Sequence, residues 1–168
     1  PFVGSPQHAA VAAEAARLGV PLVVGITEDT PDLTSFVNAQ VVVAPNVEVT
    51  SRYEKVRRVP FGEYMPMRGL LHALGAPTDL VPRDAVAGTG PAVLELPDGT
   101  RLAVVISWEV FFGGRANEGV EAGGAIIRSA RTWATFGGCL HTVRFVNEQK
   151  ADVVAAQVAR CLGCNHLE

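Results

Sequence analysis

Residues 102–114 read LAVVISWEVFFGG, in which five apolar residues in succession lead into a serine, a tryptophan and a glutamate. A short apolar run of this kind, bounded by turn signals, predicts a strand buried on both faces. Upstream, the apolar segment 92–96 and the Pro-Asp-Gly turn at 97–99 predict a hairpin with it. Downstream, the pattern predicts a helix over 116–121 and another strand over 125–127. The alternation of predicted strands and helices along the chain indicates an α/β fold.

Ser107 stands directly after this apolar run, where the chain is predicted to leave the sheet. The end of a buried strand is a favoured place for a nucleophile, because the sheet fixes the backbone while the side chain projects into a crevice. Ser107 is therefore the first candidate for a reactive residue.

The N-terminal half predicts a second set of elements of the same kind. Residues 7–18 are rich in strong helix formers, and Gly19 is placed to end the helix. A buried strand is predicted over 21–27. Strands over 36–44 and 47–53, separated by a Pro-Asn turn, predict a hairpin.

Between the two halves, RRVPFGEYMP (57–66) carries prolines and a glycine that interrupt regular structure and predict an ordered loop. A short helix over 67–74, closed by Gly75, is expected next. Ordered loops of this kind often carry functional residues.

Composition narrows the possible functions. With 168 residues, 48% of them hydrophobic, the chain is long enough for one domain with a core. A net charge of −3, with no basic block beyond Arg57-Arg58, argues against a nucleic-acid partner. The apolar runs fall far short of the roughly 20 residues of a membrane-spanning helix. Because the chain starts at Pro1 rather than Met, we expect a segment of a larger protein.

Three cysteines, at 139, 161 and 164, lie within the last thirty residues. An odd, crowded number does not describe a disulfide framework, so we expect them to be unpaired. CLGC (161–164) with His166 has the spacing of half a zinc site, but structural zinc takes four ligands. The sequence predicts neither a metal nor a cofactor.

Three strings together carry a family resemblance: RYEK (52–55), VPFGEYMP (59–66) and ISWEVFF (106–112). In their order and spacing they resemble the apolipoprotein N-acyltransferase family of the carbon-nitrogen hydrolase (nitrilase) superfamily. That family has a lysine eight residues before the glutamate of its PFGEY-like segment, matched here by Lys55 and Glu63. It also has a nucleophilic cysteine at a strand end, where this chain has Ser107. The resemblance covers about 19–127.

The resemblance implies a four-layer αββα sandwich of the nitrilase superfamily and transfer of an acyl chain from a phospholipid to the N-terminal cysteine of lipoproteins. It implies no cofactor, and a parent protein in the bacterial cell membrane with this domain on the extracytoplasmic face. We expect 1–127 to be a partial carbon-nitrogen hydrolase domain, incomplete at its N-terminus, and 128–168 to be a divergent, atypical C-terminal segment. The sequence predicts no oligomeric state.

The resemblance also implies catalytic roles for Lys55, Glu63 and Glu109 beside Ser107. Lys55 would stabilise an oxyanion, Glu63 would accept from Lys55 or position the donor, and Glu109 would orient donors around the oxyanion. The structural alternatives are a solvated lysine at a strand end, a turn-capping or surface glutamate at position 63 and an ordinary surface charge at position 109.

Aromatic residues in the same strings are candidates for substrate binding. Trp108 and Phe111 would line an acyl-chain groove, although large aromatics after a buried strand are more often core residues. Tyr64 would face lipid or substrate. These assignments are hypotheses from the resemblance.

Three departures from the family pattern weaken the functional prediction. Ser107 replaces the cysteine, and a carboxylate base suited to a thiol is poorly matched to a hydroxyl. The family's base glutamate, in a Trp-Pro-Glu-like segment, would precede Pro1, and the pattern fades after Ile127. We therefore expect the chain alone to be inactive. A soluble amidase or nitrilase and a catalytically disabled, binding relative are the alternatives.

Overall fold

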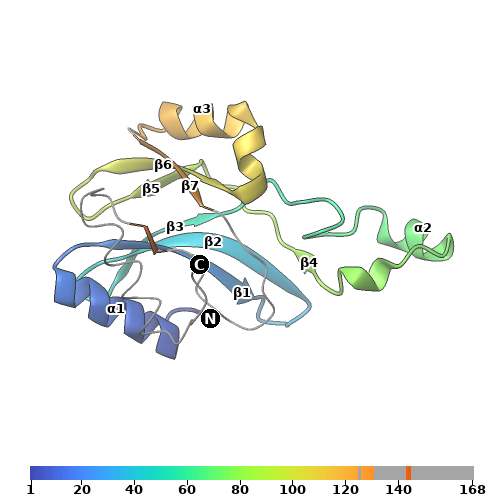
Figure 1. The fold of residues 1–168 in the computed structure, drawn as a ribbon, viewed down its shortest axis with the longest axis horizontal. Coiled ribbons are helices and arrows are strands. Elements are labelled where there is room, and N and C mark those ends of the chain that lie inside the picture. Colours follow the sequence, from blue (N-terminus) through green and yellow to red (C-terminus); the bar gives the residue numbers. More distant parts are fainter. Residues whose placement is uncertain (125, 131–142, 145–168) are drawn as a thin grey trace, which may run out of the picture.

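The apolar segments pair into two stacked sheets in the computed structural model, which describes residues 1–124, 126–130 and 143–144 (Figure 1). The elements are α1 (Pro6–Leu18), β1 (Leu22–Asp29), β2 (Ser35–Val43), β3 (Val49–Glu54), α2 (Arg68–Ala73), the 3-10 turn η1 (Thr78–Leu80), β4 (Asp84–Ala85), β5 (Val93–Glu95), β6 (Arg101–Ile106), the 3-10 turn η2 (Ser107–Phe111), α3 (Gly113–Glu121), β7 (Ile126–Ala130) and β8 (Val143–Arg144).

The first sheet has the order β3-β2-β1-β8, with β4 pairing in parallel with β2, and its other pairs are antiparallel. The second has the order β5-β6-β7, in which β5 and β6 form the predicted hairpin and β7 runs parallel to β6. Helix α1 covers the first sheet and α3 covers the second (Figure 1). The predicted α/β class and four-layer αββα sandwich are confirmed.

Alternation along β1 and β2 divides the core in two. Val24 and Val41 belong to the cluster that packs against α1, whereas Val23 and Val42 belong to the cluster between the sheets. Successive side chains of a strand point to opposite faces, so strands buried on both faces supply both clusters. From the second sheet, the inter-sheet cluster contains Leu94, Leu96, Leu102, Val104 and Ile106.

Local chemistry explains the ends of α1. The Ser5 hydroxyl accepts the backbone N–H of His8 at 3.1 Å, and Pro6 opens the helix. Gly19 takes the left-handed conformation (φ 67°) and donates its N–H to the carbonyl of Ala15. The helix predicted over 7–18 is confirmed, with its start one residue earlier.

Several predicted boundaries moved, among them the three that follow. The third strand begins at Val49 rather than 47, because Val47 has φ 78° and closes a turn onto the carbonyl of Ala44. Helix α3 begins at Gly113 rather than 116, since packing on the sheet overrides the low helix propensity of its glycines. Strand β7 continues beyond 127 to Ala130 because it pairs with β6 over its whole length.

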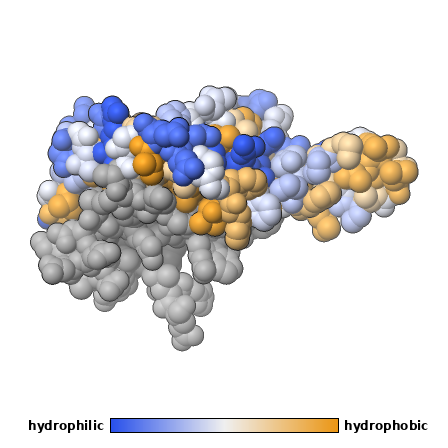
Figure 2. Space-filling model, turned by 90° about the horizontal axis from the view of Figure 1, so that it is seen from above, coloured by the Kyte–Doolittle hydropathy of each residue, from blue (hydrophilic) through white to orange (hydrophobic). Residues whose placement is uncertain are grey.

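The segment 60–84, here called the arm, carries α2 away from the sandwich (Figure 1). Five large apolar side chains on it are exposed, and Figure 2 shows the apolar surface gathered at its far end. They are Phe61, Met67, Leu70, Leu74 and Leu80.

The helix predicted over 151–161, the cysteines and the CLGC half-site lie outside the described residues. In the described part of the chain, no helix is long and apolar enough to span a membrane, and no group of three metal-ligating side chains occurs. The boundary expected at residue 127 stays a prediction.

Candidate active site

Ser107 sits where β6 ends and the 3-10 turn η2 begins. Its backbone has φ 51°, the left-handed region that residues other than glycine rarely occupy. Strain of this kind persists only where the surrounding structure enforces it, and it gathers at functional sites. The tight turn leaves Ser107 half-buried at the C-terminal end of β6, the central strand of the second sheet.

Glu109 is fully buried two residues later. One carboxylate oxygen accepts the backbone N–H groups of Val56 (2.8 Å) and Arg57 (3.0 Å), and the other accepts the N–H of Ile106 (2.9 Å). The Tyr53 hydroxyl lies 2.8 Å from both oxygens. Glu109 therefore ties the chain just after Lys55 to the chain just before Ser107. The interpretation of Glu109 as an ordinary surface charge is wrong.

Lys55 directly follows β3 and is only 1% exposed. Its ammonium donates to Glu63 at 2.6 Å. The same oxygen of Glu63 accepts from Asn38 at 2.9 Å, while the other accepts the Val59 N–H at 2.8 Å. The Thr27 hydroxyl in turn donates to the side-chain amide oxygen of Asn38 at 2.9 Å. The solvated-lysine interpretation is wrong, because Lys55 is buried and hydrogen-bonded, as a buried charge requires.

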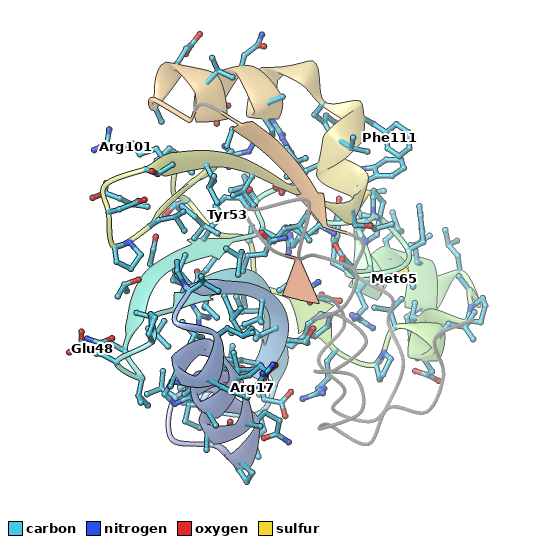
Figure 3. All side chains as sticks on the ribbon, turned by 60° about the vertical axis from the view of Figure 1, so that its left-hand side comes forward. Arg17, Glu48, Tyr53, Met65, Arg101 and Phe111 are labelled. Atoms are coloured by element: carbon cyan, nitrogen blue, oxygen red, sulfur yellow. The ribbon has the colours of Figure 1, made fainter. Side chains whose placement is uncertain are left out.

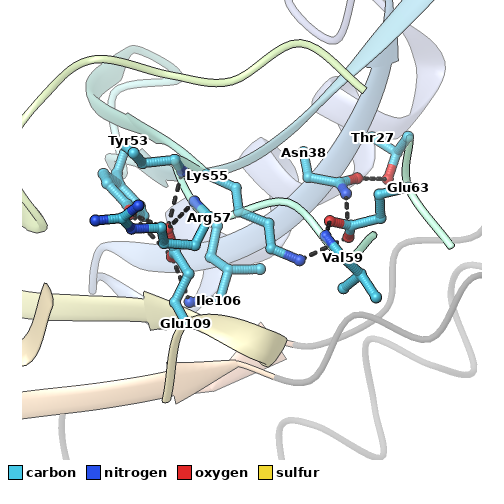
Figure 4. A network of polar contacts seen from close by, with 10 residues as sticks. Thr27, Asn38, Tyr53, Lys55, Arg57, Val59, Glu63, Ile106 and Glu109 are labelled. Carbon is cyan, nitrogen blue, oxygen red and sulfur yellow. Dashed lines mark hydrogen bonds and ion pairs between the residues drawn. The ribbon is translucent and has the colours of Figure 1, made fainter. Parts of the chain in front are cut away.

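Figure 4 shows the two carboxylates on either side of Lys55, Glu109 toward β6 and Glu63 toward β2. Each accepts several hydrogen bonds, so the orientation of both carboxylates is fixed. The structure thus brings Lys55, Glu63 and Glu109 into one network, with Ser107 held next to it through the Ile106 backbone.

The candidate substrate-binding aromatics lie at the surface. Phe111 is 76% exposed and Trp108 is 36% exposed, and their rings meet edge to face at 5.5 Å. The interpretation of these two as core residues is wrong. Tyr64 is half-buried at the base of the arm, where the Arg58 guanidinium stacks 4.3 Å from its ring centre. The structure does not join Tyr64 to the Trp108–Phe111 pair.

Residues 4–159 match the family model for carbon-nitrogen hydrolases. The chain belongs to the carbon-nitrogen hydrolase family. It is 30% identical over 140 residues to the apolipoprotein N-acyltransferase of Mycolicibacterium smegmatis, covering 81% of this chain and 23% of that protein. It is also 30% identical over 106 residues to the apolipoprotein N-acyltransferase of a Nostoc species, covering 63% and 21%. This carbon-nitrogen hydrolase chain thus spans less than a quarter of these relatives.

Solved structures show the same fold. A mutant amidase from Nesterenkonia sp. AN1, with the acetamide moiety of fluoroacetamide added covalently at its active-site cysteine, aligns with a TM-score of 0.51. It is 17% identical and covers 74% of this chain and 40% of the amidase. A mutant of the same amidase with serine in place of a cysteine aligns at 0.50, with 19% identity over 72% and 39% of the two chains.

Sequence reasoning missed four residues of this carbon-nitrogen hydrolase network: Thr27, Asn38, Tyr53 and Arg115. Tyr53 lies inside the RYEK string, and polar residues within apolar strands are a weak signal for Thr27 and Asn38. Arg115, on a glycine-rich helix, gives no local signal at all.

Burial raises the pKa of Tyr53 well above its ordinary value of 10, and the neighbouring Glu109 charge raises it further, while the Arg115 hydrogen bond opposes this. For Arg115, burial lowers the pKa, but its hydrogen bond to Tyr53 and the acidic neighbours outweigh burial, and the net shift is upward. Tyr53 therefore stays a neutral hydroxyl and Arg115 a cation at physiological pH.

Proposed function

We propose that this carbon-nitrogen hydrolase domain is part of an apolipoprotein N-acyltransferase, in which Ser107 carries the acyl group between a phospholipid donor and the N-terminal amine of a lipoprotein acceptor. The observation that carries the proposal is the buried Lys55 with its partner Glu63, tied through Glu109 to the strand end that presents Ser107. The two relatives named above bear the same name and support it.

In the first step, the Ser107 oxygen attacks the ester carbonyl carbon of the donor, and its proton passes to a general base. The bond from that carbon to the glycerol oxygen breaks, and the glycerol oxygen takes the proton. In the second step, the acceptor amine attacks the Ser107 ester, an amide forms, and the serine oxygen regains a proton from the amine by way of the base.

Lys55 is assigned to oxyanion stabilisation, because a positive charge excluded from water is most effective where negative charge develops. Its ammonium is held by Glu63 at 2.6 Å, so we assign Glu63 to positioning Lys55. Hydrogen-bond donors occupy the oxygens of both Glu63 and Glu109. We therefore assign the general base to a carboxylate other than these two.

The apolar arm supports a lipid donor over a small, water-soluble amide. Leu74 and Leu80 are 75% and 77% exposed, and contiguous apolar surface of this kind commonly marks contact with a membrane or another protein. The exposed Trp108 and Phe111, next to Ser107 in the chain, are assigned to the acyl chain, and Tyr64 to the donor. A phospholipid donor and a lipoprotein acceptor would place the parent protein at the bacterial membrane, with this domain outside the cytoplasm.

An acyl-transfer assay tests the proposal in the full-length protein that contains this domain, with a phospholipid donor, a diacylated lipopeptide acceptor and mass spectrometry for the acyl-enzyme. We expect the native protein to transfer the acyl group, and Ser107→Ala to lose both the acyl-enzyme and the transfer. Ser35→Ala, a control at the start of β2 and distant in sequence from Ser107, should behave as the native protein does. Hydrolysis of small amides without transfer would instead indicate an amidase.

A catalytically disabled relative is the second candidate, and one observation favours it: a serine occupies the position where the acyltransferase family has a cysteine. A hydroxyl loses its proton far less readily than a thiol, so a base matched to cysteine activates serine poorly. In the same assay, transfer by Ser107→Cys alone would establish this candidate and overturn Ser107 as the natural nucleophile.

A further inference from the structure

A second set of buried polar groups lies behind Glu109, on the side away from Lys55. Tyr53, on β3, is 2% exposed and places its hydroxyl 2.8 Å from both Glu109 oxygens. Arg115, on α3, is 5% exposed and donates from Nη2 to the Tyr53 oxygen at 3.0 Å and to the Gly90 carbonyl at 3.1 Å. Figure 3 shows Tyr53 between the two sheets, and Figure 4 shows its contact with Glu109.

The donor and acceptor capacities of the groups fix the direction of the hydrogen bonds at the Tyr53 hydroxyl. A guanidinium can only donate, so the Tyr53 oxygen accepts from Arg115. The single phenolic hydrogen must then point at Glu109, which is an acceptor. Because the pKa of Tyr53 is raised by burial, this hydrogen is retained at physiological pH. Arg115 thus sets the orientation of Tyr53, and Tyr53 donates to the carboxylate.

The charge of Glu109 is otherwise met mainly by backbone N–H groups. Its nearest cationic group is Arg115 Nε, 3.9 Å from a carboxylate oxygen and too far for a hydrogen bond. Removing the Tyr53 donor would leave one side of a fully buried carboxylate unsatisfied, which is unfavourable enough to displace the group. Displacement would loosen its hydrogen bonds to the backbone of Val56 and of Ile106 together.

We propose that Tyr53 and Arg115 are positioning residues that set the placement of Lys55 relative to Ser107 by fixing the Glu109 carboxylate. The inference rests on the proposed acyl-transfer function and adds two residues that act through Glu109 without touching the substrate. Misplacement of reacting groups by about 1 Å costs on the order of 100-fold in rate even when its cause is remote.

The test compares Tyr53→Phe with Val104→Ala in the full-length protein. Tyr53→Phe removes one hydroxyl and keeps the ring in the inter-sheet core. Val104→Ala opens a cavity in the same core without touching the network. We expect Tyr53→Phe to lower kcat about 100-fold with KM for the donor nearly unchanged. We expect Val104→Ala to lower the unfolding temperature at least as much, yet keep kcat within about twofold.

Arg115→Lys is the second variant. It keeps the positive charge but lacks the planar guanidinium that contacts Tyr53, Gly90 and Glu118 at once. We expect kcat to fall less than in Tyr53→Phe. Equal kcat in Tyr53→Phe and the native protein, or equal losses in Tyr53→Phe and Val104→Ala, would overturn the inference.

A chemical-labelling experiment tests this inference independently of the proposed function. In the Ser107→Cys background, iodoacetamide alkylation at position 107 is followed by peptide mass spectrometry, with and without Tyr53→Phe. If no form transfers an acyl group, the proposed function fails, but slower alkylation with Tyr53→Phe still supports positioning of the strand end. Unchanged alkylation at every pH from 6 to 9 would overturn it.

Discussion

Ser107 combines two properties at one position, the side chain proposed as the nucleophile and an unfavourable backbone conformation. A left-handed conformation costs a residue with a Cβ roughly 1–2 kcal/mol. With φ 51° at the end of β6, the residue keeps this conformation because the sheet on one side and the Glu109 bonds on the other fix the turn. Strain and the proposed catalytic role therefore coincide at this residue.

Replacing Ser107 by glycine is expected to stabilise the fold relative to Ser107→Ala. Glycine adopts positive φ without steric conflict, although it loses more chain entropy on folding, so we expect the free energy of unfolding to be higher by about 0.5–1 kcal/mol. Urea denaturation of both variants, each lacking the nucleophile, measures the difference. An alanine variant as stable as the glycine variant would contradict strain at this position.

At the scale of elements, α3 approaches the second sheet closely because its contact residue is glycine. A Cβ built at Gly119 would lie 2.5 Å from the carbonyl oxygen of Ala92 and 2.8 Å from the Cβ of Ala103. This close approach brings Arg115, on the same helix, within reach of Tyr53. Helix packing therefore governs the network behind Glu109.

Gly119→Ala is expected to push α3 from β6 and lower the free energy of unfolding by about 1–3 kcal/mol, as overpacking does. Gly114→Ala, on the same helix with open space around its Cβ position, is the matched control and should be neutral or slightly stabilising. Thermal unfolding of both variants is the measurement. Equal unfolding temperatures for the two variants would contradict tight packing at Gly119.

Helix α1 carries a pH-dependent ion pair. Arg17 donates two hydrogen bonds to Glu14, at 2.8 and 2.6 Å, and these lower the pKa of Glu14 below its ordinary value of 4.5, against the opposing effect of burial. The folded state therefore binds this proton less readily than the unfolded state does. The contribution to stability is present above pH 4.5 and is lost as pH falls through the lower, folded-state pKa.

Glu14→Gln should accordingly be less stable than the native chain at pH 7, by roughly 0.5 kcal/mol because Arg17 is half in solvent. The difference should shrink as pH is lowered below 4.5. Urea denaturation at pH 7, 5 and 3 follows it. A difference that stays constant over this range would contradict the assignment.

The described part of the molecule consists of a four-layer sandwich and an arm that projects from it (Figures 1 and 2). The five exposed apolar side chains of the arm pack on little of the described protein, and none of the residues of α2 is buried. Their removal should therefore leave folding almost untouched while changing what the surface contacts.

The double change Leu70→Ser and Leu74→Ser is expected to alter the free energy of unfolding by less than about 0.5 kcal/mol. It should also reduce co-sedimentation of the protein with phospholipid vesicles, as expected of a lipid-contacting arm. Val3→Ser with Val120→Ser, two exposed valines of the sandwich, is the control. Equal co-sedimentation of the two double variants with vesicles would show that Leu70 and Leu74 do not contribute to lipid binding.

Local patterns in the sequence determined much of this protein: helix α1 with its cap at Gly19, the buried strands β1 and β6, the turn at Gly99 and the position of Ser107 at a strand end. These features follow from periodicity and turn chemistry, which act over a few neighbouring residues. The spacing of Lys55 and Glu63 belongs to the same class, because the pair is only eight residues apart.

Only the tertiary structure decided that Glu109 is buried, that Trp108 and Phe111 are exposed, and that α3 begins at Gly113. Tyr53 and Arg115 meet across 62 residues of chain, and Tyr53 and Glu109 across 56. Burial and hydrogen-bond partners at such separations depend on how the two sheets and α3 stack, and no local pattern encodes that stacking.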